Sequence, residues 1–234
     1  MLTLVIGNQN YSSWSMRPWV LLTDAAIPFT EVKVRFDAFT PDSQFKRTLA
    51  AWAPTAQVPV LQIAEPGAAP YAVWDTLAIT ETVAERFPDR AIWPADAAQR
   101  AHARSLCAEM HSGFGALRSA FGMNIEAHLP EVGARLLAER EAVRADLARI
   151  TAMWLDCLQR FGGPWLMGER FGAVDAYYAP VAMRLRSYAL PVPAEVTAYI
   201  ERLVQRPSVA AWIAAALAEH DFLAFEEPYR TRRD

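Results

Sequence analysis

The first 87 residues alternate between short apolar runs and helical patterns. The apolar run at residues 2–6 predicts a strand, and alternating charged and apolar residues at 31–36 predict a second strand with one solvated face. Two more strands are expected at 58–63 and 71–74. Helical spacing follows the first and the last of these strands, so the predicted order is β-α-β-(irregular)-β-β-α.

Strand patterns stop at Asp96, and the rest of the chain is predicted to be helical. Apolar residues step by three or four along one long helix and then along a second. Those of the first are Ala103, Cys107, Met110, Phe114, Leu117 and Phe121, and those of the second are Val143, Leu147, Ile150, Trp154 and Leu158. Further helices are expected at residues 174–186, 194–204 and 208–219. Pro207 and Ser208 are predicted to supply the break and the cap between the last two.

These patterns divide the chain into two domains. Residues 1–87 form an α/β domain, residues 88–95 a linker, and residues 96–234 an all-α bundle of about five helices.

Composition narrows the classes of partner. The chain has 234 residues, 53% hydrophobic and 21% charged, which is usual for a folded globular protein. Its net charge is −3 and only the last few residues are rich in arginine, so nucleic acid and anionic membranes are poor candidates. No apolar run is long enough to span a bilayer, and the N-terminus has no basic leader or cleavage site. We expect a cytoplasmic protein with neither a membrane nor a nucleic-acid partner.

The cysteines and histidines suggest no metal site. Cys107 and Cys157 lie within helical patterns and outside any CxxC motif, which favours buried thiols over a disulfide. The four histidines show no ligand spacing with cysteines or acidic residues. We therefore expect no bound metal and a reducing compartment.

A serine-rich loop joins the first strand to the first helix. Ser12, Ser13 and Ser15 stand where free backbone N–H groups and the positive end of the helix dipole favour a bound anion. The alternative is that these serines cap the helix, a role that serine often takes.

Two other segments could contribute to the same site. Residues 57–60, Gln-Val-Pro-Val, place a proline at the start of a strand. An X-Pro bond can be cis at a cost of about 0.5–1 kcal/mol, which would turn the backbone of Val58 toward a ligand. Asp75 and Thr76 precede a helix and could take an ammonium and a carboxylate, or serve as a plain N-cap. Together the three segments suit a short zwitterionic peptide with a reactive end.

In this order, the motifs resemble those of the cytosolic glutathione transferases over nearly the whole chain. Residues 12–17, Ser-Ser-Trp-Ser-Met-Arg, are similar to the Ser-Ser-x-Ser-x-Arg loop of serine-type, zeta-like members. Residues 58–61 are similar to the cis-proline segment, 75–79 to the helix start that holds the γ-glutamyl group, and 171–175 to the capping motif of a buried helix. The resemblance implies an α/β thioredoxin-like N-terminal domain plus an all-α helical-bundle C-terminal domain.

Two residues depart from the family pattern. Gly172 stands where the capping motif usually has serine or threonine, and glycine is a tolerated cap. Trp14 stands where zeta-like members carry a cysteine, which weakens the transfer of their isomerase activity and removes thiol–disulfide exchange from this loop.

The resemblance implies that glutathione is the co-substrate, with its sulfur near Ser12. Ser12 is expected to donate to the thiolate, Ser13 to support it, and Ser15 to cap the helix. The residues expected to bind glutathione are Trp14, Gln57, Val58, Pro59, Asp75 and Thr76. The candidates for a hydrophobic-substrate wall are Tyr11, Trp14, Met110, His111, Phe114 and Met123, although such a stripe is also typical of a core.

The leading hypothesis is a glutathione S-transferase that conjugates the thiolate to small apolar electrophiles. One alternative is a glutathione-dependent isomerase or dehalogenase, and another is a non-catalytic glutathione-binding or regulatory protein of the same fold. A homodimer is expected, with Phe45, Trp52 and Trp74 as candidate contact residues.

Overall fold

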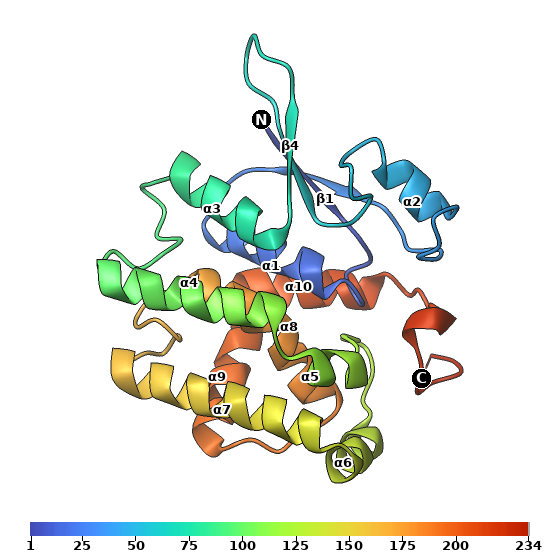
Figure 1. The fold of residues 1–234 in the computed structure, drawn as a ribbon, viewed down its shortest axis with the longest axis vertical. Helices are drawn as coiled ribbons and strands as arrows, with labels where there is room; N and C mark the ends of the chain where they lie inside the picture. The colour runs from blue at the N-terminus through green and yellow to red at the C-terminus, as the bar shows by residue number, and fades with distance from the viewer. Residues whose placement is uncertain (234) are drawn as a thin grey trace.

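The N-terminal half of the chain forms one mixed sheet with strand order β2-β1-β3-β4, in a computed structural model that describes residues 1–233. Strand β1 (Leu2–Ile6) pairs in parallel with β2 (Thr30–Lys33) and antiparallel with β3 (Val60–Ile63). Strand β4 (Tyr71–Trp74) pairs antiparallel with β3 and forms the other edge (Figure 1). The expected α/β architecture is confirmed.

Helices cover both faces of this sheet. Helices α1 (Ser13–Asp24) and α3 (Thr76–Arg86) pack on the face that carries Leu4. Helix α2 (Gln44–Leu49) packs on the opposite face with Val5. Because successive side chains of a strand point to opposite faces, β1 is buried on both sides and reads as a continuous apolar run.

The second strand is shorter than the predicted 31–36 and ends at Lys33. The alternation of apolar and charged residues continues beyond the last paired residue, because Val34 and Phe36 remain buried on the α2 side of the sheet. The Phe36 ring occupies the space beside Gly7, where an added Cβ atom would lie 2.3 Å from it. The predicted face was right, and the predicted length was wrong.

Strand β3 begins two residues later than predicted. The Val58–Pro59 peptide bond is cis, so the geometry that the sequence allowed is present. The ladder starts at Val60, which leaves Val58 and Pro59 outside the paired register.

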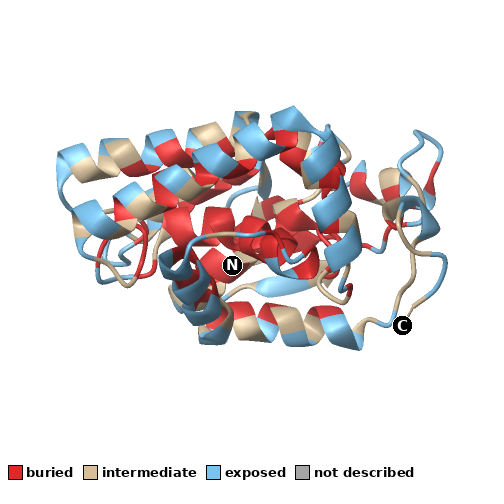
Figure 2. Cartoon of the chain, turned by 90° about the horizontal axis from the view of Figure 1, so that it is seen from below, coloured by how far each residue is buried: buried red, intermediate tan, exposed pale blue. Residues whose placement is uncertain are grey.

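The C-terminal half is helical, as predicted, and packs beneath α1 (Figure 1). Its α-helices are α4 (Ala97–Ser112), α5 (Gly115–Ala120), α6 (Pro130–Glu139), α7 (Glu141–Phe161), α8 (Ala173–Ser187), α9 (Ala194–Gln205) and α10 (Pro207–Ala218), and a short 3-10 helix, η1 (Ala224–Glu226), follows. Helix α8 contacts α1, α4 and α9. All of its residues except Arg186 are buried, and Figure 2 shows this buried centre in red.

The C-terminal half has seven α-helices among the described residues, more than the predicted five or so. Three predictions about individual helices were also wrong. The single long helix expected over Ala103 to Phe121 is two helices, because Phe114 adopts a positive φ of 56° between them. Helix α6 was not predicted. Ser208 does not cap α10; its hydroxyl donates to Asp24 in α1, and Arg206 holds the same carboxylate at 2.6 Å.

The start of α8 explains the unusual Gly172. The carbonyl of Ile92 in the linker accepts from Ala173 N, and a Cβ atom on Gly172 would lie 3.2 Å from that carbonyl oxygen. The Asp175 carboxylate accepts from the N–H of Gly172 at 3.1 Å and from that of Leu166 at 3.0 Å. Half of the capping box is therefore retained without a hydroxyl at Gly172.

Candidate active site

Ser12 is the N-cap of α1. Its Oγ accepts from Ser15 N at 3.4 Å and donates to Ser15 Oγ at 2.8 Å. Ser15 Oγ also accepts from Gly7 N at 3.1 Å, which ties the first turn of α1 to the end of β1. The prediction that Ser15 caps this helix was therefore wrong, because Ser12 takes that role.

Ser13 is held from the other domain. Its Oγ accepts a hydrogen bond from Arg184 Nη2 of α8 at 3.2 Å. The same guanidinium donates to the carbonyls of Phe121 at 2.7 Å and Pro180 at 3.2 Å. The serine loop and the buried helix of the bundle thus form one unit.

Trp14 connects this loop to the second predicted segment. Its ring lies edge-on to His111 at 5.2 Å between centroids. His111 Nε2, at the end of α4, lies 3.3 Å from Asp75 Oδ2. Trp14, His111 and Asp75 are therefore brought together, although they are distant in sequence.

Asp75 and Thr76 form the start of α3. Asp75 is the N-cap, with a φ of 74°, and its Oδ1 accepts from Leu77 N at 3.0 Å. Thr76 is buried, and its Oγ1 accepts from the Tyr177 hydroxyl of α8 at 2.9 Å. The Asp75 side chain is 46% exposed, so its carboxylate remains accessible to a ligand.

The cis-proline segment borders the apolar cluster beneath the serine loop. Tyr11 belongs to that cluster, and Val58 packs against it. Gln57 is exposed, Val58 is half-buried and Pro59 is buried. These positions leave the backbone at Gln57 and Val58 free of the ladder at the sheet's end.

Most candidates for the hydrophobic wall are packed in the interior. Met110, Phe114 and Met123 belong to the main core cluster. Tyr11 is also buried, and its hydroxyl donates to Glu227 Oε1 at 2.7 Å. Trp14 and His111 are half-exposed.

Sequence reasoning missed an arginine cluster formed by Arg17, Arg118 and Arg184. The Arg17 guanidinium lies 4.1 Å from the Trp14 ring centroid, and that of Arg118 lies 5.2 Å from it. Burial, together with the charge of Arg118, lowers the pKa of Arg17 to about 10. Burial, together with the charges of Arg17 and Arg118, lowers the pKa of Arg184 to about 9. Both remain protonated at neutral pH. The family motif marks only Arg17; the others meet it through tertiary packing.

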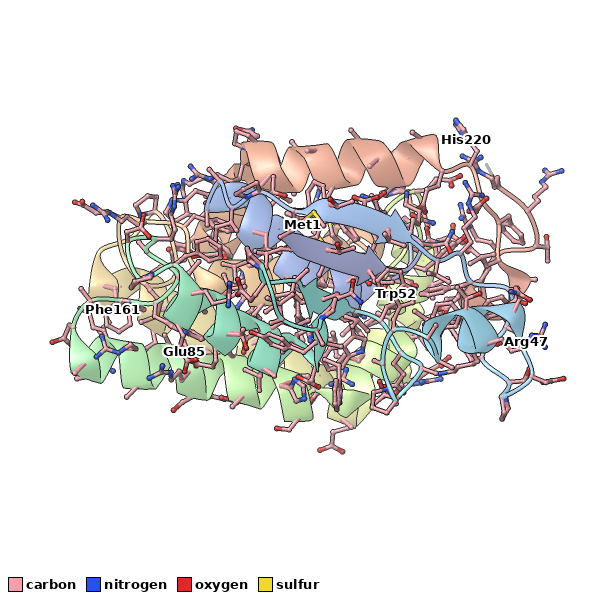
Figure 3. All side chains as sticks on the ribbon, turned by 90° about the horizontal axis from the view of Figure 1, so that it is seen from above. Met1, Arg47, Trp52, Glu85, Phe161 and His220 are labelled. Carbon is pink, nitrogen blue, oxygen red and sulfur yellow. The ribbon has the colours of Figure 1, made fainter. Side chains whose placement is uncertain are left out.

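A C-terminal tail, residues 219–233, was also missed as part of this region. His220, labelled in Figure 3, marks where the chain leaves α10 for the tail. Glu219 accepts from the backbone N–H of Gln9 at 2.7 Å and of Asn10 at 3.1 Å. The tail therefore fixes the loop that leads into the serines, and no local sequence pattern signals such a pairing.

A possible ligand cluster and a cleft lie outside these segments. Ligand atoms of His102, Asp156 and Cys157 lie within 4.8 Å of one another, a proximity that spacing alone did not predict. Burial raises the pKa of Cys157 to about 12, so this thiol is protonated at neutral pH. A cleft of about 990 Å³ along the linker is lined by Trp93 and Arg104 among others and includes none of the predicted site residues.

Among the described residues, no helix combines the length and apolar character needed to cross a membrane.

Comparison with solved structures shows the same fold. A glutathione transferase homolog from Burkholderia gl BGR1, solved with bound glutathione, is 24% identical with a TM-score of 0.64, covering 93% of this chain and 98% of that one. A Sulfitobacter homolog with bound glutathione is also 24% identical, with a TM-score of 0.65 and coverage of 90% and 96%. A glutathione transferase from Methylococcus capsulatus is 21% identical, with a TM-score of 0.67 and coverage of 93% and 100%. No curated protein matches the chain.

Family models agree with the fold. The model for the glutathione S-transferase N-terminal domain matches residues 11–86, and the model for the C-terminal domain matches residues 97–215. The chain therefore belongs to the glutathione S-transferase family.

Proposed function

We propose that this protein conjugates the thiolate of glutathione to small apolar electrophiles. The observation that carries the proposal is the contact chain from Trp14 through His111 to Asp75, which brings the starts of α1 and α3 to one place. Two helix N-termini there can hold the sulfur and a carboxylate of the same tripeptide. The bound glutathione in two structural neighbours supports this choice of ligand.

Each proposed glutathione contact has a chemical role. The backbone at Gln57 and Val58, next to cis Pro59, would pair with the extended peptide. Asp75 would accept from the α-ammonium group. Thr76 is fully buried and its hydroxyl accepts from Tyr177, so it would support the start of α3 from the interior rather than touch the ligand.

The sulfur would lie at Ser12 and Ser13. A free thiol titrates near 8.5, and lowering its pKa by two units requires about 2.7 kcal/mol of preference for the anion. One hydroxyl hydrogen bond to a charged group provides about 1.5–3 kcal/mol. A helix N-terminus adds about 0.3–1 kcal/mol, or ~2 when partly buried. The hydroxyl and the helix N-terminus together suffice to lower the pKa of the thiol by two units without a general base.

The electrophile would bind beside the half-exposed rings of Trp14 and His111. Tyr11, Met110 and Phe114 would support this wall from the interior rather than touch the substrate. In the reaction, the sulfur electron pair forms a C–S bond, and the leaving group departs with the electrons of its own bond.

We further propose a homodimer. Trp74 is its most accessible candidate contact, because Trp52 is half-buried and Phe45 is buried.

Retention on immobilised glutathione, followed by turnover of an activated aryl halide, tests this function. We expect both retention and turnover. Retention without turnover over a broad panel of electrophiles would favour a binding protein. Turnover of a maleyl-type substrate without net consumption of glutathione would favour an isomerase. Failure to bind glutathione at all would reject the proposal.

We place the protein in a reducing compartment such as the cytoplasm, since both cysteines are free thiols.

A further inference from the structure

Helices α4 and α7 carry three metal-binding side chains that meet between them. His102 belongs to α4, and Asp156 and Cys157 are consecutive residues of α7. One ligand atom from each side chain lies within 4.8 Å of the other two. The expectation of no metal was drawn from spacing along the chain, whereas these ligands are brought together by the packing of two helices that are distant in sequence.

Contacts around the cluster hold α4 and α7 in register. About two turns away along both helices, Arg149 of α7 forms a bidentate salt bridge with Glu109 of α4, with N–O distances of 2.7 and 2.8 Å. The ring of His102 lies 5.8 Å from that of Phe161 at the end of α7. The three ligands therefore stand on rigid elements in a fixed register, which favours a precise site.

The polar atoms of these three side chains have no other partner. Within residues 1–233, none of the three side chains forms a hydrogen bond or a salt bridge, and His102 Nε2 is buried without a partner. A buried polar nitrogen that lacks a partner is unfavourable, so a ligand for this ring would stabilise the fold. Binding an ion would break no hydrogen bond or ion pair that these side chains make.

Burial increases across the cluster from the surface to the core. Asp156 is exposed, His102 is half-buried and Cys157 is fully buried. The carboxylate at the rim gives an ion a path of entry, and the thiol at the bottom gives it a ligand that is shielded from solvent. The cluster is therefore both accessible to an ion and able to enclose it on the inner side.

The set of donor atoms selects among metals. Nitrogen, sulfur and oxygen donors together suit zinc, whereas magnesium and calcium take oxygen ligands. A thiolate and a carboxylate balance the double charge of the ion, and a neutral imidazole adds no charge. In a tetrahedral site with bonds of about 2.0–2.3 Å, the ligand atoms lie roughly 3.3–3.8 Å apart, so movements of about 1 Å would close this cluster around the ion.

We propose that His102, Asp156 and Cys157 bind one zinc ion that links α4 to α7. On binding, the Cys157 thiol releases its proton to solvent, and the sulfur keeps the electron pair and donates it to zinc. The imidazole and the carboxylate each donate a lone pair, and a water molecule kept by the ion takes the fourth position on the exposed side. None of the three residues belongs to the proposed glutathione site, so zinc and glutathione bind at separate places.

Cobalt tests this site, because Co²⁺ can replace zinc and a thiolate bound to Co²⁺ absorbs in the near ultraviolet. Protein without an affinity tag, freed of metal with a chelator, is titrated with Co²⁺ and then with Zn²⁺. We expect a thiolate-to-cobalt band that saturates at one equivalent and disappears as zinc displaces cobalt. Calorimetry with Zn²⁺ should give the same stoichiometry, and excess Zn²⁺ should raise the midpoint of thermal unfolding.

Variants assign the ligands. Cys157→Ala should abolish the band and lower zinc affinity about 100-fold or more, and Asp156→Asn should lower the affinity about 10-fold. Cys107→Ala is the matched control, because Cys107 is also a buried free thiol and lies outside the cluster, and it should leave the band and the affinity unchanged. Should Cys157→Ala fail to fold, Asp156→Asn and His102→Gln still decide the question.

Two results would overturn the zinc site. One is the absence of a thiolate-to-cobalt band in wild type, or its persistence in Cys157→Ala. The other is an equal zinc affinity in wild type, Asp156→Asn and His102→Gln. Zinc binding is measured without glutathione, so failure of the zinc site leaves the proposed function standing.

Discussion

Individual side chains near the start of α1 divide between holding the loop and facing the proposed ligand. Ser15 is fully buried and joins Gly7 to Ser12, so it belongs to the fold. Tyr11 is likewise occupied by Glu227. Asp75 is different, because it caps α3 with one carboxylate oxygen and presents a half-exposed group to solvent. A substitution at Asp75 can therefore separate capping from ligand binding.

Asp75→Asn is expected to weaken glutathione binding about 10-fold or more while leaving stability nearly unchanged. Asparagine tolerates the positive φ of 74° and still caps a helix, but it loses the negative charge that would hold the ammonium group. Calorimetric titration and thermal unfolding measure the two effects. Asp96→Asn is the matched control, since Asp96 caps α4 in the same way, and it should leave glutathione affinity intact. An unchanged affinity in Asp75→Asn would exclude the ammonium role.

At the scale of elements, the start of α8 is held within the C-terminal half by the buried carboxylate of Asp175. Asp175 accepts from Gly172 N, Leu166 N and the Tyr199 hydroxyl, and burial nevertheless raises its pKa to about 6. The folded state therefore holds the Asp175 proton more tightly than the unfolded chain does. As the pH rises through 4 to 6, this group's contribution to stability must fall.

Asp175→Asn should lower the free energy of unfolding by about 1–3 kcal/mol, because an amide nitrogen would face the Gly172 N–H in place of an acceptor. The loss should be largest near pH 4 and smaller at pH 7, since the variant lacks the titration that destabilises the wild type as the pH rises. Urea unfolding at several pH values measures this difference. A wild type that gains stability relative to the variant between pH 4 and 6 would contradict it.

Helix α6 packs closely on the turn after α8. A Cβ atom on Gly133 would lie 1.9 Å from the carbonyl oxygen of Tyr188, whereas one on Gly115 in α5 would meet nothing within 4 Å. Gly133→Ala should therefore destabilise the protein by about 1–3 kcal/mol through overpacking. Gly115→Ala, the control, should be neutral or slightly stabilising because alanine favours a helix. Equal unfolding midpoints for the two variants would show that α6 can move away at little cost.

The features that could be predicted from the sequence are those encoded by residues close together in the chain. Strand β1, the loop with its serines and the cap at Asp75 were predictable because apolar runs and cap residues act over a few positions. The break at Phe114 was missed because helical spacing continues across it. The pairing of Arg184 with Ser13 depends on residues 171 positions apart, which no local pattern encodes.

At the scale of the whole molecule, the C-terminal tail closes over the loop that leads into α1. The Glu219 side chain is nearly fully buried and accepts from Gln9 N, Asn10 N and Lys33 Nζ. Trp212 of α10 donates to the Gln9 carbonyl at 3.0 Å, so α10 and the tail hold the same loop. The serines thus depend on contacts between the two ends of the chain.

Glu219→Gln should speed amide hydrogen exchange at residues 9–12 and lower the free energy of unfolding by about 1–3 kcal/mol. One acceptor is lost, and Lys33 loses its ion pair and keeps its hydrogen bond to Gln9 Oε1. Arg35→Gln breaks an exposed ion pair with Asp221 in the same tail and should change neither quantity appreciably. Equal exchange rates in wild type and Glu219→Gln would mean that the tail does not hold the loop.

The most direct test of the account is a pH titration of glutathione bound to the wild-type protein, in which the absorbance of the thiolate is measured. A hydroxyl and a helix N-terminus acting together predict a midpoint about two units below the value near 8.5 of a free thiol. A midpoint equal to that of free glutathione, with binding confirmed in the same sample, would contradict it.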